Sequence, residues 1–301
     1  SQLKGYSLEP VETKPFYDLI SSKISMEQVF SDIRDKDRLH EEIFDFNPDF
    51  VFHLAAQSLV IKSYEIPADT FDVNVVGTAN LLEVVRDLNK QITTIVVTTD
   101  KVYENVEDGL LFKETDRLGG HDPYSASKAC TEIVVDSFRK SFFSHHDEIL
   151  KKPIATARAG NVIGGGDWNE NRIIPDIIKS LQKGETIVVR NPNAVRPWQH
   201  VLEPLTGYLQ LAAQLEKYPE TFSSAFNFGP VPSDHLTVKE LTEYAVKIWG
   251  QGNITFANRL PKYHEAKLLQ LDITKSTTQL HWRPKLTASD AIKWSIDWYK
   301  M

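Results

Sequence analysis

The sequence lacks several features that would assign it to whole classes of protein. It has one cysteine, Cys130, among 301 residues, which excludes an internal disulfide framework. No long apolar run and no signal-peptide pattern is visible. It also lacks an excess of positive charge, and the formal net charge of −7 argues against a general affinity for nucleic acid or anionic membranes. We therefore expect a cytoplasmic protein with neither kind of partner.

A glycine turn of the kind that binds dinucleotides is also missing. A dinucleotide-binding sheet opens with a strand, a G-x-G-x-x-G turn and a helix whose N-terminus binds the pyrophosphate. Gly164-Gly165-Gly166 has the wrong spacing and comes too late in the chain. Lys4-Gly5-Tyr6 resembles the end of a second strand. We therefore predict about thirty or more further residues upstream in the natural protein, the length of one β-turn-helix unit, which its intact mass would test.

Short apolar runs alternate with longer helical patterns in the first half of the chain. Residues 50–54, 92–98 and 154–159 are predicted to be buried strands, and residues 72–88 and 124–138 to be the helices between them. The order βαβαβ predicts an α/β fold with a Rossmann-like, doubly wound parallel sheet. The first strand and glycine turn of that sheet are absent from this chain.

Beyond residue 160 the pattern changes, and we expect a smaller mixed lobe that binds the substrate, with one return to the main sheet. Helices are predicted at 173–181, 203–215, 238–249 and 289–299, and strands at 186–190 and 225–228.

The strongest catalytic signal is Tyr124-Ser125-Ala126-Ser127-Lys128. Residues four apart share one face of a helix, so the Tyr124 hydroxyl and the Lys128 ammonium group can reach the same ligand. A nearby cation lowers the pKa of a tyrosine and makes it a usable general base. Such pairs also occur by chance on solvated helix faces. This one follows a strand ending in Thr98-Thr99-Asp100, where open α/β sheets bind ligands.

Asp100 and Lys101 stand side by side at that strand end. Adjacent residues of an extended chain point to opposite sides, so we expect independent placement rather than a direct ion pair. A solvated charge pair in a loop is the alternative interpretation.

Five segments resemble the nucleotide-sugar branch of the extended short-chain dehydrogenase/reductase superfamily. They are Leu54-Ala55-Ala56-Gln57, Asn74-Val75-Val76-Gly77-Thr78, Thr98-Thr99-Asp100, Tyr124 to Lys128, and Arg158-Ala159-Gly160-Asn161-Val162. Within that branch, Asp100-Lys101, Arg158 to Trp168 and Arg190 to Pro204 are similar to the CDP-glucose 4,6-dehydratase family. Dehydratases acting on dTDP-glucose or GDP-mannose carry glutamate where Lys101 stands. The resemblance covers nearly the whole chain and fails only at the missing glycine turn.

The resemblance implies an NAD-dependent lyase that converts CDP-D-glucose to CDP-4-dehydro-6-deoxy-D-glucose, a precursor for deoxysugar, O-antigen and lipopolysaccharide synthesis. Tyr124, supported by Lys128, would take the proton of the sugar's 4-hydroxyl as hydride leaves C4, with Thr99 bonded to the same oxygen. Neutral Lys101 would remove the C5 proton, and protonated Asp100 would protonate the departing 6-hydroxyl. Hydride would then return to C6. Burial and water exclusion favour the neutral forms that these roles need.

The same resemblance implies the binding residues. For NAD they are Asp32, Ile33, Ala55, Ala56, Gln57, Asn74, Thr98, Tyr124 and Lys128. For the nucleotide sugar they are Gln57, Asn161, Arg172, Arg196, His200 and Lys267, since planar or cationic donors suit phosphate oxygens. Relatives often carry arginine where Lys267 stands, and any of these residues could instead be ordinary surface or packing residues. We expect no metal site, because His145-His146-Asp147 lacks further spaced ligands.

Two domains and an oligomer are expected. Residues 1–160 and 200–230 are assigned to the NAD-binding Rossmann domain, and residues 161–199 and 231–301 to the nucleotide-sugar-binding domain. Members of the superfamily pair through helices corresponding to residues 72–90 and 124–139. A homodimer or higher homo-oligomer is therefore expected.

Two alternative functions stay open. A nucleotide-sugar 4-epimerase shares NAD, Tyr124 and Lys128, but has no step at C5 or C6 and so no use for Asp100 and Lys101. A catalytically silent NAD(H)-binding or regulatory protein is suggested only by the missing glycine turn.

Overall fold

The computed structural model describes residues 2–10, 16–106, 109–143, 151–234, 236–257 and 268–301. The chain divides into two compact units, which are described one at a time. Unit 1 consists of residues 1–98, 119–157 and 211–225, and unit 2 of residues 99–118, 158–210 and 226–301. The binding roles of the two predicted domains stay predictions.

Unit 1 is built on parallel strands. β3 (Phe50–His53), β4 (Thr93–Val97) and β5 (Ile154–Ala159) pair side by side in parallel. The sheet order is β10-β5-β4-β3, in which β10 (Ala225–Phe228) begins at the last residue of unit 1 and continues in unit 2. Every residue of β5 is buried, as expected for a parallel strand covered on both faces. The predicted α/β fold with a Rossmann-like parallel sheet is confirmed.

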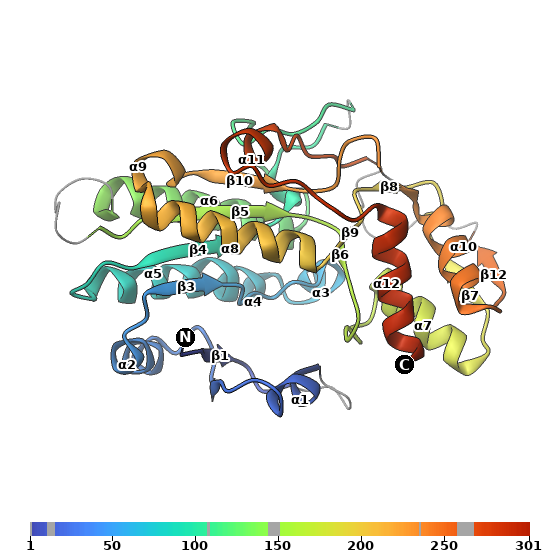
Figure 1. The fold of residues 1–301 in the computed structure, drawn as a ribbon, viewed down its shortest axis with the longest axis horizontal. Coiled ribbons are helices and arrows are strands. Elements are labelled where there is room, and N and C mark those ends of the chain that lie inside the picture. Colours follow the sequence, from blue (N-terminus) through green and yellow to red (C-terminus); the bar gives the residue numbers. More distant parts are fainter. Residues whose placement is uncertain (1, 11–15, 107–108, 144–150, 235, 258–267) are drawn as a thin grey trace. The chain divides into compact units, whose positions relative to one another are not determined.

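Helices α5 (Gly77–Asp87) and α6 (Pro123–Phe138) pack on these strands (Figure 1). Leu82, Val96, Val135 and Ile154, one from each of α5, β4, α6 and β5, form a fully buried cluster. Burying each such side chain stabilises the fold by about 1.5–3 kcal/mol. This cluster packs α5 and α6 against β4 and β5.

The predicted helix at 72–88 is two elements. Its first five residues form a π-helix, η1 (Asp72–Val76), and α5 follows. Gly77 lies at the junction, where a Cβ atom would come within 2.6 Å of the Ile33 side chain. Single π turns inside helices frequently mark functional sites.

Unit 1 also contains a separate pair of strands and several further helices. β1 (Lys4–Ser7) pairs in parallel with β2 (Glu27–Phe30) in a separate two-stranded sheet, so the strand predicted around Gly5 is present. The helices are α1 (Phe16–Ser21), α2 (Lys36–Phe46), α3 (Val60–Glu65), α4 (Pro67–Phe71), η3 (Arg139–Phe143) and α9 (Pro219–Phe222). α8 (Leu202–Lys217) crosses from unit 2 into unit 1 at Leu211.

Unit 2 has its own core, formed by α7 (Ile173–Lys183), α10 (Val238–Trp249) and α12 (Ala288–Lys300). Thr237 and Thr287 begin α10 and α12 as capping boxes, in which the threonine and an acid three residues later satisfy each other's backbone N–H groups. The helices predicted at 173–181, 238–249 and 289–299 are confirmed. Among the described residues, no helix combines the length and apolar character needed to cross a bilayer.

The strands of unit 2 are short and pair in twos. β6 (Val162–Ile163) pairs with β9 (Gln199–His200) and β7 (Ile187–Val189) with β12 (Ile254–Phe256), both in parallel, whereas β8 (Val195–Arg196) pairs antiparallel with β11 (Leu236–Thr237). The two remaining helical elements are η2 (Asp100–Val102) and α11 (Thr274–Gln279).

Candidate active site

Helix α6 carries the Tyr124 and Lys128 pair in unit 1. Asp122 begins the helix, because its carboxylate accepts hydrogen bonds from the Ser125 backbone N–H at 2.9 Å and from the Ser125 hydroxyl at 2.6 Å. Tyr124 and Lys128 are both buried, with 8% and 4% of their surface exposed. The cap therefore fixes the first turn of the helix around a buried tyrosine.

The Lys128 ammonium group is held at the end of β4, where it donates to the Val97 carbonyl oxygen at 3.1 Å. Burial lowers the pKa of Lys128 to about 8, and the Glu132 carboxylate opposes that fall. The group is therefore mostly charged at neutral pH. Because positions 124 and 128 share one helix face, this charge lies on the side of the Tyr124 hydroxyl.

Asn74, in the π-helix η1, ties the loop after β3 to α6. Its amide donates to Ser127 Oγ at 2.8 Å and to the Gln57 carbonyl oxygen at 3.1 Å, and accepts from the Gln57 backbone N–H at 2.8 Å. Ser127 Oγ in turn donates to the Tyr124 carbonyl oxygen at 2.7 Å. Both N–H groups of the Asn74 amide are thereby used within the protein, and its contact with NAD stays a prediction.

His53, at the end of β3, supports the same π turn. It is not among the site residues predicted from the sequence. Its Nε2 lies 2.9 Å from Thr78 Oγ1, and that hydroxyl donates to the Asn74 carbonyl oxygen at 2.6 Å. Nε2 must therefore carry the proton. Burial, helped by the Lys128 charge, lowers the pKa of His53 to about 3, so the ring is neutral.

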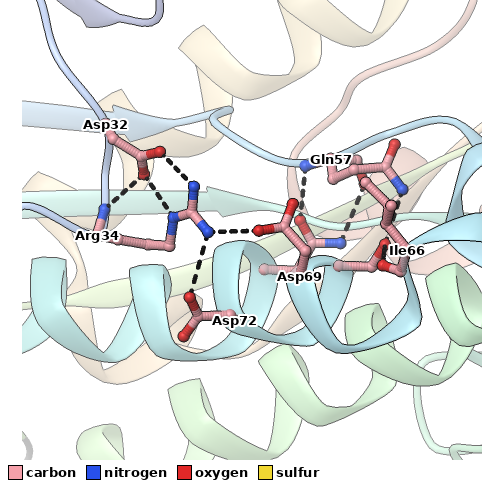
Figure 2. Close-up of polar contacts among 8 residues, drawn as sticks. Asp32, Arg34, Gln57, Ile66, Asp69 and Asp72 are labelled. Atoms are coloured by element: carbon pink, nitrogen blue, oxygen red, sulfur yellow. Dashed lines mark hydrogen bonds and ion pairs between the residues drawn. The ribbon is translucent and has the colours of Figure 1, made fainter.

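The loop after β3 holds the predicted residues Ala55, Ala56 and Gln57. The Gln57 side chain accepts from the Leu59 backbone N–H at 2.7 Å. It also donates to Thr70 Oγ1 at 3.0 Å (Figure 2). Ala55 packs against the core cluster that contains Ile33. The loop is thus fixed by its own hydrogen bonds and packing.

Asp32 and Ile33, the predicted adenine contacts, follow β2. Ile33 is buried in the core of unit 1. The Asp32 carboxylate accepts from Arg34 Nε at 3.0 Å and Nη2 at 2.6 Å, and Arg34 also pairs with Asp69 at 2.5 Å and Asp72 at 3.3 Å (Figure 2). The hydrogen bonds from Arg34 lower the pKa of Asp32, which therefore stays ionised. Its contact with adenine stays a prediction.

Thr98, the last residue of unit 1 before the chain passes into unit 2, is bonded to a buried acid on α6. Thr98 Oγ1 donates to Glu132 Oε1 at 2.5 Å, and Thr156 Oγ1 donates to Glu132 Oε2 at 2.8 Å. The sequence-based set omits Glu132. Its position four residues after Lys128, on the same helix face, was the available signal.

In unit 2, Asp100 and Lys101 form a direct ion pair. Asp100 is fully buried, and its Oδ1 accepts from Lys101 Nζ at 3.0 Å and from Thr99 Oγ1 at 3.0 Å. The expectation of independent placement is wrong. It assumed an extended chain, whereas residues 100–102 form a 3-10 turn capped by Thr99, which curls the Lys101 side chain back onto its neighbour.

Gly160 and Asn161 complete the surroundings of Asp100. A Cβ atom at Gly160 would overlap the Asp100 carboxylate, so only glycine leaves room for it. Asn161 Nδ2 lies 3.5 Å from Asp100 Oδ2, and Asn161 has a left-handed φ of 49°. The predicted substrate residue Asn161 is therefore brought next to the predicted acid.

A buried network that the sequence-based set omits supports this 3-10 turn from its far end. Arg158 Nη1 donates to the Tyr103 hydroxyl at 2.9 Å and the guanidinium lies 5.0 Å from the centre of the Tyr103 ring. The Tyr103 hydroxyl donates to Asn227 Oδ1 at 2.6 Å. Burial raises the pKa of Tyr103, so it stays protonated.

The other predicted substrate residues have separate partners. Arg172, at the start of α7, pairs with Asp167 at 3.4 Å, and Arg196 donates to the preceding carbonyl oxygen at 3.0 Å. His200 is buried, which lowers its pKa, and its Nδ1 accepts from a backbone N–H two residues later at 3.3 Å. Lys267 lies outside the described residues, and the binding roles of all four stay predictions.

The two clusters offer different chemistry. Unit 1 presents a buried tyrosine with a cation on its helix face, an arrangement suited to removing a proton from a hydroxyl group. Unit 2 presents a carboxylate and an ammonium group in contact, an acid and base for a second proton transfer. The two clusters are covalently continuous at Thr98 and Thr99. In the described part of the chain, no group of three or more His, Cys, Asp or Glu residues could hold a metal ion.

Comparison with known sequences identifies relatives along the whole chain. The family model described as GDP-mannose 4,6 dehydratase matches residues 12–294. The CDP-glucose 4,6-dehydratase of Salmonella typhimurium is 40% identical over 299 residues, covering 99% of this chain and 83% of that protein. The CDP-paratose 2-epimerase of Salmonella typhi is 27% identical over 93% of this chain and 86% of that protein.

Solved structures share the fold. The dTDP-glucose 4,6-dehydratase DesIV from Streptomyces venezuelae, solved with NAD, has a TM-score of 0.80 and 24% identity over 94% of this chain and 82% of that one. The UDP-glucuronic acid 4-epimerase from Bacillus cereus, in complex with UDP-glucuronic acid and NAD, has a TM-score of 0.83 and 21% identity over 99% and 91%. Dehydratases and epimerases therefore share this architecture, and the fold alone does not separate them.

Proposed function

The chain belongs to the GDP-mannose 4,6-dehydratase family, and from this premise we propose that it is an NAD-dependent 4,6-dehydratase acting on CDP-D-glucose. The product is CDP-4-dehydro-6-deoxy-D-glucose. The observation that carries the proposal is the ion pair between Lys101 and the fully buried Asp100, because a 4-epimerase has no proton transfer at C5 or C6 for it to perform. The CDP-glucose 4,6-dehydratase of Salmonella typhimurium, at 40% identity, supports the choice of nucleotide.

The residues of unit 1 suit NAD and the oxidation of C4. Lys128 uses one N–H group on the Val97 carbonyl, and an ammonium group has three, which leaves donors for ribose hydroxyls. NAD⁺, when bound, accepts hydride from C4 and later returns it to C6. Tyr124 takes the proton of the 4-hydroxyl, and the neighbouring charge on Lys128 stabilises the phenolate that does so.

The residues of unit 2 suit the elimination of water. Moving one proton from Lys101 to Asp100 across their 3.0 Å hydrogen bond produces the neutral amine and the protonated carboxyl group together. Lys101 then takes the proton from C5, which the 4-ketone has made acidic, and Asp100 gives its proton to the departing 6-hydroxyl. Water leaves and the ion pair is restored.

The protons balance over the full cycle. Lys101 returns its proton to C5 when C6 is reduced. Tyr124 holds the proton taken from the 4-hydroxyl, and the water that left carried one proton from Asp100. Loss of the Tyr124 proton to solvent and uptake of one proton by Lys101 reset the enzyme. The direct ion pair is thus the resting state of an acid and base that become active together.

The proposal also includes details that rest on the resemblance to the CDP-glucose 4,6-dehydratase family. The predicted contacts of Asp32, Gln57 and Asn74 with NAD and of Asn161, Arg172, Arg196, His200 and Lys267 with the nucleotide sugar belong to it. So do a cytoplasmic location and a place in O-antigen and lipopolysaccharide precursor synthesis. A homodimer through residues 72–90 and 124–139 is supported by Val76 and Ile133, apolar side chains that are 48% and 58% exposed on those segments.

The test is a substrate panel read by mass. The natural full-length protein is incubated with NAD⁺ and, separately, with CDP-, dTDP- and GDP-linked hexoses. Loss of one water from CDP-glucose alone supports the proposal. A sugar isomer without loss of water would assign the protein to the 4-epimerases, and tight NAD binding without turnover would favour a regulatory protein.

A further inference from the structure

Glu132 is a buried acid to which the proposed chemistry assigns no role. It lies on α6 with 5% of its surface exposed. Each carboxylate oxygen accepts a hydrogen bond from a threonine, Thr98 at 2.5 Å and Thr156 at 2.8 Å. Two hydroxyl donors favour the ionised form of a carboxyl group. Because Thr98 follows β4 and Thr156 lies in β5, Glu132 fastens α6 to both strands.

A buried carboxylate requires a nearby cation, and Lys128 is one helical turn away on the same face. Glu132 raises the pKa of Lys128 against the lowering caused by burial. From β3, His53 also faces Lys128, but it is neutral and balances no charge. From α6 itself, Tyr124 lies one turn before Lys128 and is negative only as the phenolate, the form that acts as the base and that becomes neutral when it takes up a proton. Glu132, which accepts hydrogen bonds from two threonine hydroxyls, is thus the acid that opposes the loss of the Lys128 charge.

We propose that Glu132 is a positioning residue for the oxidation at C4, which holds the Lys128 ammonium group in its charged form and fixes Thr98 against α6. Tyr124, Lys128 and Glu132 occupy successive turns of one helix face, so the anion stabilises the cation that stabilises the phenolate. The kinetic part of this inference rests on the proposed function. The effect of Glu132 on the charge of Lys128 does not depend on the proposed function, because it is a property of the folded protein without substrate.

The first experiment measures the charge of Lys128 directly. Glu132→Gln removes the negative charge with little change in shape, and Thr156→Val is the matched control, since it removes one of the two hydrogen bonds and leaves the charge. The titration of Lys128 is followed by NMR in protein labelled at lysine Cε, with Lys128→Met identifying the signal. We expect Lys128 to titrate about one pH unit or more lower in Glu132→Gln and close to the wild-type pH in Thr156→Val. An unshifted titration in Glu132→Gln overturns the proposal.

The second experiment measures C4 oxidation of CDP-glucose against pH, as NADH formed in a single turnover. Loss of the Lys128 charge should end C4 oxidation at high pH. The pH above which oxidation is lost should therefore be lower in Glu132→Gln than in the wild-type protein, by the same amount as the shift in the Lys128 titration. A purely structural role would lower the rate at every pH alike, which would refute the kinetic part. If the wild-type protein oxidises no CDP-hexose, the proposed function fails while the NMR titration still decides the role of Glu132.

A double variant covers the case in which Glu132→Gln does not fold. If the uncompensated Lys128 cation causes the failure, removing it as well in Glu132→Gln/Lys128→Met should restore folding, seen by circular dichroism and a cooperative thermal transition. Failure of the double variant as well would show that Glu132 acts only through its two threonine hydrogen bonds, and would overturn its charge-balancing role.

Discussion

Replacing Gly160 by alanine should separate the two halves of the reaction. A Cβ atom at this position overlaps the Asp100 carboxylate, and an ordinary contact would require that group to retreat by more than about 1 Å. The Lys101 and Asn161 contacts, at 3.0 and 3.5 Å, would lengthen beyond hydrogen-bond range. A displacement of this size in a reacting group costs about 100-fold in rate, and the added volume costs about 1–3 kcal/mol of stability.

The assay follows NADH absorbance together with the mass of the sugar nucleotide. In Gly160→Ala we expect NADH and an oxidised sugar that keeps its water, because Tyr124 and Lys128 are unaltered. Gly229→Ala is the matched control in the same unit, since its Cβ atom would have no neighbour closer than 3.7 Å. Dehydration by folded Gly160→Ala at the wild-type rate would refute the assignment of Asp100 as the acid.

Three further changes test other parts of the structure. Lys101→Glu should keep oxidation at C4 and impair elimination, because it removes the amine that takes the C5 proton; full turnover measured by mass would contradict that role. Asp122→Ala should lower the free energy of unfolding by about 1 kcal/mol through loss of the α6 cap, measured by urea denaturation, and an unchanged value would show that the cap is redundant. Lys128 titrates at about 8 in the folded protein and at about 10.4 when unfolded. The unfolded state therefore binds more protons between these values, and stability should rise with pH there by about 3 kcal/mol; Lys128→Met should lack this rise, and an identical pH dependence in both proteins would refute it.

Most elements of secondary structure were predictable because they depend on short segments. The strands at 154–159 and 225–228 have the predicted bounds, and the helix predicted at 238–249 is α10. Apolar periodicity and capping residues act within one or two turns of the chain, so the sequence around each element contains the information. The Tyr124 and Lys128 pair was predictable for the same reason, since four-residue spacing fixes a shared helix face.

The conformation after β4 was not predictable in this way. Thr99 caps the 3-10 turn locally, but Arg158 and Asn227 hold its far end through Tyr103. Those partners lie 55 and 124 residues away in the chain. Sequence therefore determined that an acid and a base stand at this strand end, and only the tertiary structure decided that they form an ion pair.

The importance of Glu132 and His53 follows from their burial, which the sequence alone does not show. In the sequence, Glu132 is one acid among the 41 Asp and Glu residues, and His53 is one histidine at a strand end. The fold buries both, bonding Glu132 to Thr156 and His53 to Thr78, 24 and 25 residues away. Desolvation and these long-range partners set the charge of a buried group. The sequence by itself determined which groups can carry the chemistry, and the tertiary structure decided which of them are charged and what holds them.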